Sequence, residues 1–219
     1  MKRVLLILAG MIAFAIGGVA SSQAADWPAN VRAVYDINFN GFNVGAFEFH
    51  SQSEEDSYTL TGNAQLSLLL GAFTWIGETR TFGLIANRMP QPAAFAFDFK
   101  ANSKIGSTKM DFADGVVADV RHSPPPVPKP GTVPLRQQHL KGVLDPLSAI
   151  MVVARSNPNP CDRRLPIFDG KERFDLVLSY KGQMKVSEQQ PSGQPAIAHV
   201  CKVKYQPIAG HKVDTENSF

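Results

Sequence analysis

This 219-residue sequence lacks the local patterns that mark the common catalytic and nucleotide-binding sites. It contains no Gly-x-Ser-x-Gly elbow, no Ser-x-x-Lys motif, no His-Glu-x-x-His pair and no glycine-rich phosphate loop. A single histidine on a strand is more often a surface or hydrogen-bonded residue than a catalytic base, and here the histidines all occur singly: His50, His122, His139, His199 and His211. We therefore predict no catalytic residue, no cofactor and no metal site.

The sequence is also short of charge clusters and of long hydrophobic runs. Its formal net charge is +3, and no basic cluster is longer than the Arg163-Arg164 pair. Such a chain offers no basic patch for nucleic-acid binding. Beyond the N-terminus, hydrophobic stretches such as residues 66–72 are too short to span a bilayer. The mature chain is therefore not expected to be an integral membrane protein.

The one long apolar run lies at the N-terminus and has the layout of a secretory signal. Lys2 and Arg3 precede an almost unbroken apolar stretch over residues 4–16, and Ser22-Gln23-Ala24 places small residues at −3 and −1 of a cleavage site. The run is shorter than a comfortable membrane span, which favours cleavage over an anchor. We expect residues 1–24 to be removed and residues 25–219 to form a single domain in the periplasm.

Only two cysteines are present, Cys161 and Cys201, and both lie after the predicted signal. In an oxidising compartment, two cysteines in one domain are expected to form a disulfide. The alternative is a reactive or metal-binding pair, which would need further cysteines or well-spaced histidines, and only His199 lies nearby. We predict a structural bridge.

Hydrophobic and polar residues alternate through most of the remaining chain, which is typical of half-buried strands. The clearest alternation is in residues 93–100, and Asp114-Gly115 predicts a hairpin turn. Another hairpin is expected from strands at 31–40 and 46–52, joined by a turn at 41–45. Residues 66–76 could form a short helix or a buried strand, and two glycines weaken both interpretations. About nine or ten strands predict a mainly β, antiparallel protein.

One segment has the periodicity of a helix, over about residues 146–155. Asp145 is placed to cap its first turn, and Pro146 suits the first helical position. Leu147, Ile150 and Met151 fall on one apolar stripe that the helix would bury. The predicted architecture is a strongly curved antiparallel sheet that forms a barrel or spiral, with this helix packed on or in it as a plug.

Prolines are concentrated in residues 124–134, just before this helix. Such a segment adopts extended, polyproline-type structure. It could be a recognition peptide, or a stiff spacer that carries the chain across the sheet to the helix. Its place between structured segments favours the spacer.

Four segments together resemble the domain of unknown function 3108 family, which consists of exported bacterial proteins. They are Tyr35 with the 41–45 turn, residues 145–150, Cys161 with residues 165–174, and residues 200–211. The resemblance covers nearly all of the mature chain and implies a periplasmic, β-barrel-like or spiral domain with a Cys–Cys bridge. Its architecture is similar to that of envelope-integrity proteins and, more remotely, to half-barrels that carry lipoproteins. It implies no catalytic residues. Because the family pattern normally continues into further strands, we also expect the C-terminus at Phe219 to be truncated.

Phenylalanine is abundant, with 14 residues, and several of them share one face of a predicted strand. One short helix can cover only part of such a surface, so an apolar concavity is expected to stay open. The predicted ligand face consists of Tyr35, Phe47, Phe49, Phe95, Phe97 and Phe99. These features favour a non-enzymatic envelope protein that binds a lipid, another apolar ligand or a hydrophobic partner segment.

Two other functions are compatible with the same sequence. One is a structural or interaction module that supports envelope integrity through a protein partner, with no small ligand. The other is a hydrolase of envelope material, which would require His199, His211 and Asp169 to converge in space.

Overall fold

The computed structural model describes residues 30–127, 129–154, 159–189 and 195–213. The predicted signal segment and the chain end at Phe219 lie outside the described residues. The described chain consists mostly of strands, arranged in a seven-stranded and a three-stranded sheet, so the prediction of a mainly β protein is confirmed. No helix within these ranges is both long and apolar enough to cross a bilayer.

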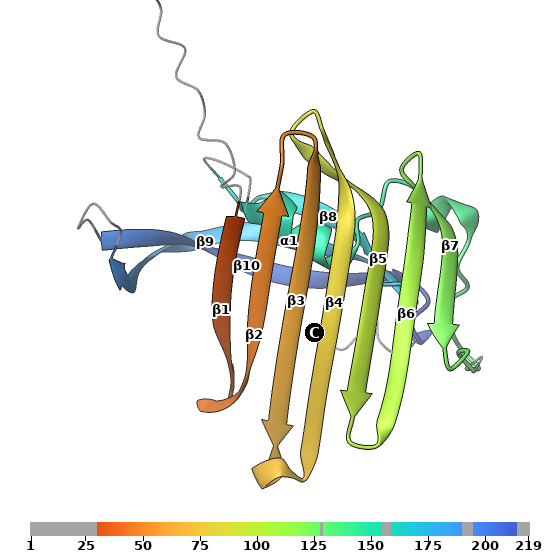
Figure 1. Ribbon diagram of the computed structural model, residues 1–219, viewed down its shortest axis with the longest axis horizontal. Helices are drawn as coiled ribbons and strands as arrows, with labels where there is room; N and C mark the ends of the chain where they lie inside the picture. Colours follow the sequence, from red (N-terminus) through yellow and green to blue (C-terminus); the bar gives the residue numbers. More distant parts are fainter. Residues whose placement is uncertain (1–29, 128, 155–158, 190–194, 214–219) are drawn as a thin grey trace, which may run out of the picture.

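The first seven strands form one antiparallel sheet in which each strand pairs with the next along the chain (Figure 1). They are β1 (Asn30–Phe39), β2 (Phe42–Ser53), β3 (Ser57–Leu68), β4 (Phe73–Ala86), β5 (Met89–Ala101), β6 (Lys104–Ala113) and β7 (Val116–Ser123). The ambiguous run 66–76 is neither one helix nor one strand. It contains the end of β3, a 3-10 turn η1 (Leu69–Gly71) and the start of β4.

Tight turns join several of these strands and explain their register. Asn40 and Gly41 have φ values of 50° and 82°, and Asp114 and Gly115 have 50° and 72°. Two-residue hairpin turns of this kind need positive φ at both positions, which Asn-Gly and Asp-Gly adopt readily. The hairpin at Asp114-Gly115 forms as predicted. The turn predicted at 41–45 is wrong, because Asn40-Gly41 makes the turn and Phe42 already belongs to β2.

A second layer lies behind one half of this sheet. It contains the helix α1 (Pro146–Ala154) and a sheet of β8 (Arg163–Phe168), β9 (Arg173–Gln189) and β10 (Pro195–Ala209), in the order β10-β9-β8. In Figure 1, β9 and β10 cross behind the upper part of the large sheet. The proline-rich connection joins the layers and is held to the end of β10, since Val133 N donates to His211 O at 2.9 Å. A 3-10 turn, η2 (Gln137–Leu140), follows it.

Closure of the sheet into a barrel or spiral is not confirmed. β1 and β7 are the edges of the seven-stranded sheet, and β8–β10 form a separate ladder, so the described strands make two open sheets. Alternation predicts that a strand has an apolar face, but it does not predict whether a sheet closes on itself or is covered by another.

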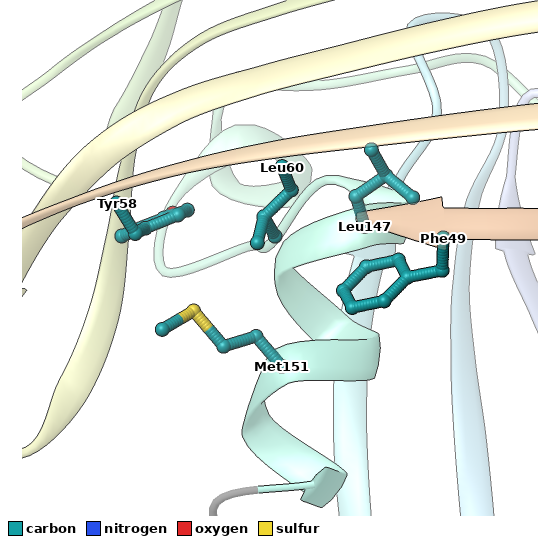
Figure 2. Close-up of a cluster of buried hydrophobic side chains, with 5 residues drawn as sticks. All are labelled: Phe49, Tyr58, Leu60, Leu147 and Met151. Carbon is teal, nitrogen blue, oxygen red and sulfur yellow. The ribbon is translucent and has the colours of Figure 1, made fainter. Parts of the chain in front are cut away.

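Helix α1 is therefore sandwiched between two sheets and does not plug a barrel. On one side, Leu147 and Met151 pack against a cluster on β2 and β3 (Figure 2), formed by Phe49, Tyr58 and Leu60. On the other side, Ala149 and Val152 pack against the small sheet. Ile150, which the apolar stripe assigned to the buried side, is 38% exposed. Burial on two opposite sides leaves only the narrow strip at Ile150 and Ala154 facing out.

A disulfide links the two outer strands of the small sheet. Cys161 lies just before β8, Cys201 lies on β10, and their sulfur atoms are bonded. β9 lies between these two strands in the sheet order, so the bridge spans both edges of the layer that holds α1 in place.

Replacing Cys161 with Ser should reduce the free energy of unfolding by about 4 kcal/mol, the chain-entropy value for a separation of 40 residues. Urea unfolding of the oxidised protein and of Cys161→Ser would measure the difference. Reducing the wild type should bring its stability down to that of the variant and leave the variant unchanged. Equal stabilities of oxidised wild type and variant would contradict a stabilising bridge.

Candidate functional site

One face of the seven-stranded sheet, which we call the inner face, lies against α1 and the small sheet. These elements cover the part of it nearest the β2–β3 and β4–β5 turns. Near the β1–β2, β3–β4 and β5–β6 turns, no described helix or strand lies behind β1–β5 (Figure 1). The inner face is thus divided along its strands into a covered half and an uncovered half.

Five aromatic rings extend from the border of the covered half into the uncovered half, and we call them the aromatic floor: Tyr35, Phe47, Trp75, Phe97 and Phe99. Two of them, Phe47 and Phe97, also pack against the buried clusters of the covered half. Tyr35 stacks on Phe47 with ring centroids 6.1 Å apart. Phe97 contacts Trp75 at 6.1 Å and Phe99 at 5.6 Å. Tyr35 is 52% exposed, and the other four rings are half-buried. The floor is therefore an apolar surface that solvent still reaches.

Glycines beneath the rings explain why this surface is low and flat. Gly62 lies under the ring of Phe47, Gly77 under Trp75 and Gly106 under Phe99, and a Cβ atom at any of the three would overlap that ring. Glycine leaves room in a strand for close approach, and a ring lying over it shields the exposed backbone. The rings consequently lie against the sheet and leave the space above them open.

An open groove continues the floor to the end of the sheet. It has a volume of about 920 Å³ and lies between the β1–β2 turn and η1. Its apolar lining comes from Phe39, Phe42, Val44, Leu68, Leu69 and Phe73. Leu68 pairs with Phe73, two positions along β3 and β4 from the pair of Leu66 with Trp75, so these side chains share the face of the floor. A volume of this size is within the range of small-molecule sites.

The opposite, outer face of the sheet has a different chemistry. Arg32 contacts Glu48 at 2.6 Å, and Arg121 contacts Asp111 at 2.6 Å. The hydrogen bond from Arg32 lowers the pKa of Glu48 below its usual range. These ion pairs are exposed and contribute little stability. The outer face also exposes apolar side chains, among them Val34, Ile76, Phe82 and Leu84. Among the described residues of the large sheet, the ring–ring contacts lie on the inner face.

The covered half of the inner face contains a buried polar network at the start of α1. Asp145 Oδ1 accepts hydrogen bonds from the Thr81 hydroxyl at 2.7 Å and from the amides of Leu147 and Ser148 at 3.0 and 3.1 Å. Ser148 Oγ donates to Asp145 Oδ2 at 2.5 Å and lies 2.7 Å from the Tyr58 hydroxyl. Because Ser148 uses its single proton on Asp145, Tyr58 is the donor in the last bond.

This network attaches the helix to β3 and β4 and is closed to substrates. Its side chains, Tyr58, Thr81, Asp145 and Ser148, are at most 2% exposed. Burial raises the pKa of Asp145, and the hydrogen bonds from Ser148 and Thr81 act in the opposite direction. Burial likewise raises the pKa of Tyr58. The perturbed pKa values therefore belong to a structural contact, and the open surface lies elsewhere.

Of the six residues predicted as a ligand face, the structure places four in the aromatic floor and two in the core. All six share the inner face, but Phe49 and Phe95 are only 2% and 5% exposed and belong to the core beneath the second layer. Tyr35, Phe47, Phe97 and Phe99 remain in the aromatic floor. Trp75 was missed, because it lies in the run 66–76 whose type was left open. The alternation of Phe73, Trp75 and Gly77 on one face of β4 was the signal that could have found it.

The three residues that a hydrolase would need do not converge. His199 and Ala209 lie ten positions apart on β10, a distance of about 30 Å along a strand, and His211 follows Ala209. Asp169 accepts hydrogen bonds from the amides of Lys171 and Glu172 in the β8–β9 turn. Among the described residues, no group of three or more His, Cys, Asp or Glu side chains could hold a metal ion.

Asp145→Asn should make stability less dependent on pH. Because burial raises the pKa of Asp145 in the folded state, that state binds the proton more tightly than the unfolded chain does. This contribution is complete below the ordinary aspartate pKa of about 4 and is lost as the pH rises through the raised pKa of Asp145.

Urea titrations at about pH 4 and about pH 7 would measure the effect, as a smaller fall in the free energy of unfolding for Asp145→Asn than for wild type. Asp114→Asn, in the exposed β6–β7 turn, is the matched control and should keep the wild-type fall. The same fall in Asp145→Asn and in wild type would show that Asp145 does not titrate as the geometry requires.

Gly77→Ala should lift the indole of Trp75 away from the sheet, because the new Cβ would occupy the position of the ring. The expected result is a red-shifted Trp75 emission spectrum, measured in a Trp27→Phe background so that only one of the two tryptophans reports. Gly106→Ala is the control, since it displaces Phe99 and leaves room for the indole. An unchanged spectrum in Gly77→Ala would contradict the flat packing of Trp75.

Comparisons with known proteins identify a family without an assigned activity. A family model described as "Protein of unknown function (DUF3108)" matches residues 34–217. No curated protein and no solved structure matches the chain. The matched region includes the aromatic floor, the end groove, α1 and both cysteines. The chain therefore belongs to the DUF3108 family.

Proposed function

We propose that this protein is an exported, non-enzymatic envelope protein that binds a lipid or another apolar ligand on its aromatic floor. The observation that carries the proposal is the set of accessible aromatic rings that make up the floor. Three of these rings lie flat over glycines of the sheet, which leaves the space above them open. A ligand lying there would complete, over the uncovered half, the second layer that α1 and the small sheet provide over the other half.

The chemistry of the floor favours an acyl chain or a similar apolar group. The rings and the residues between them, Ala64 and Leu66, carry no charge, so a charged ligand would lose its hydration without gaining a partner. Burying apolar surface contributes roughly 25 cal/mol per Å². Covering several half-buried rings at once can therefore supply the free energy for binding without any polar anchor.

The proposed compartment rests on two features of the chain. The N-terminal segment has the layout of a secretory signal. The disulfide between Cys161 and Cys201 suits an oxidising environment such as the periplasm. An interaction module with no small ligand is the second candidate, and the same experiment separates the two.

Phe99→Ser should weaken binding of a fluorescent fatty acid roughly tenfold, because it removes one ring from the floor. The matched control is Phe82→Ser. Phe82 lies on the neighbouring strand β4 and faces outward, with 49% of its surface exposed, so its loss should leave affinity unchanged. Fluorescence titration of protein expressed with its own N-terminal segment and purified from the periplasm would provide the affinities.

Native mass spectrometry of the same preparation should detect a co-purified lipid in wild type and less of it in Phe99→Ser. Absence of bound lipid, together with no fatty-acid binding by wild type, would overturn the proposal and favour the interaction module. Equal weakening by Phe99→Ser and Phe82→Ser would show that the ligand does not use the floor.

A further inference from the structure

We propose that the end of the seven-stranded sheet formed by the β1–β2, β3–β4 and β5–β6 turns docks on the surface of an anionic phospholipid bilayer. We call this end, residues 37–45, 66–76 and 99–106, the apolar end. The proposal goes beyond ligand binding, because it assigns a second partner to a surface that adjoins the floor and shares Trp75 and Phe99 with it. It holds whether or not the floor binds a ligand.

The apolar end exposes large hydrophobic side chains at or beside all three turns. Phe42 is 76% exposed at the β1–β2 turn, Leu69 is 81% exposed in η1, and Ile105 is 71% exposed beside the β5–β6 turn. Phe39 is also 64% exposed. Antiparallel strand order brings these turns to one edge, which Figure 1 shows at the bottom of the sheet. Apolar side chains clustered in this way mark an interaction surface.

Leu69 shows that this exposure is built into the backbone. Its φ is +53°, in the left-handed region that a leucine rarely adopts. The backbone therefore accepts strain in a 3-10 turn whose leucine side chain points into solvent. Residues held in strained backbone conformations cluster at functional sites.

The charge distribution selects an anionic partner for this end. The three segments of the apolar end contain no Asp or Glu, and their only charged residues are Lys100 and Lys104. The nearest acidic residues, Asp36, Glu78 and Asp98, lie on the strands just beyond these segments. The opposite end carries the acidic β2–β3 loop, with Glu54, Glu55 and Asp56. An anionic surface would attract one end of the sheet and repel the other, which orients the molecule with its strands pointing at the surface.

The order of side chains along the strands, from the turn tips inward, matches the layers of a bilayer interface. Phe42 and Leu69, at the turn tips, are more exposed than the aromatic rings of Tyr35 and Trp75, which lie further along the strands. Phe and Leu tips enter the boundary between headgroups and acyl chains, and Tyr and Trp prefer the headgroup level. The end groove opens between these tips.

Flotation with phosphatidylglycerol vesicles and with phosphatidylcholine vesicles would test this docking. Wild type should float with phosphatidylglycerol vesicles and much less with phosphatidylcholine. Phe42→Ser combined with Leu69→Ser should reduce the partition coefficient by roughly tenfold or more, because both tips lose their apolar insertion. Leu84→Ser combined with Met89→Ser is the control. These residues are 52% and 49% exposed near the opposite end, and their loss should leave partitioning unchanged.

A second pair of variants tests the charge. Lys100→Glu with Lys104→Glu should weaken binding to phosphatidylglycerol vesicles roughly tenfold, whereas Lys202→Glu with Lys204→Glu, on β10, makes the same change in net charge and should have little effect. No flotation of wild type, or equal losses in the tip variants and their controls, would overturn the proposal. If wild type does not bind vesicles but forms a dimer that the tip variants abolish, the docking proposal is overturned and the apolar end is a contact between two copies of the chain.

Two variants separate this proposal from ligand binding by the floor. Lys100→Glu with Lys104→Glu changes no ring of the floor and no residue that lines the end groove, so without vesicles it should bind the fluorescent fatty acid as wild type does. Phe97→Ser removes a ring of the floor that lies outside the apolar end, and it should float as wild type does. Vesicle docking can then fail while ligand binding holds, and ligand binding can fail while docking holds.

Discussion

The hydrogen-bonded attachment of α1 to β3 and β4 is the contact on which the rest of this structure depends. A helix of nine residues is too short to be stable alone in water. Here its first turn is held by Asp145, Ser148 and Tyr58, and its sides are buried between two sheets. Losing one partner would leave buried polar groups unsatisfied, which costs about 1–3 kcal/mol for each group. The helix thus joins two sheets that share no ladder among the described strands.

The position of this attachment also decides which surface stays open. Since α1 and β8–β10 lie over one half of the inner face, the strands of the large sheet change role along their length. β5 shows this within a few residues, because Phe95 is in the core, Phe97 packs against that core and against Phe99, and Phe99 belongs to the open part of the floor. One set of strands thus supplies the core at one end and a candidate binding surface at the other.

In the uncovered half, glycines leave room on the sheet surface, and aromatic rings lie over them. A bare apolar sheet face would expose backbone, and projecting side chains would fill the space that a ligand needs. Rings laid over Gly62, Gly77 and Gly106 shield the backbone and keep the surface low. The two ends of the sheet differ in charge, because the β2–β3 loop carries Glu54, Glu55 and Asp56. The open surface runs from the buried helix toward turns that carry no acidic residue.

The sequence by itself determined the local features of this protein. Alternation predicted the strands and the shared face of Tyr35, Phe47 and Phe97, Asp114-Gly115 predicted a hairpin, and the cap pattern at Asp145 predicted the start of the helix, because each depends on neighbouring residues only. Tertiary structure alone decided that the sheets stay open, that Ile150 faces out and that Phe49 and Phe95 lie in the core. It also placed Trp75 in the floor. These outcomes depend on which surfaces from distant parts of the chain meet, and the period of a strand or helix does not encode that contact.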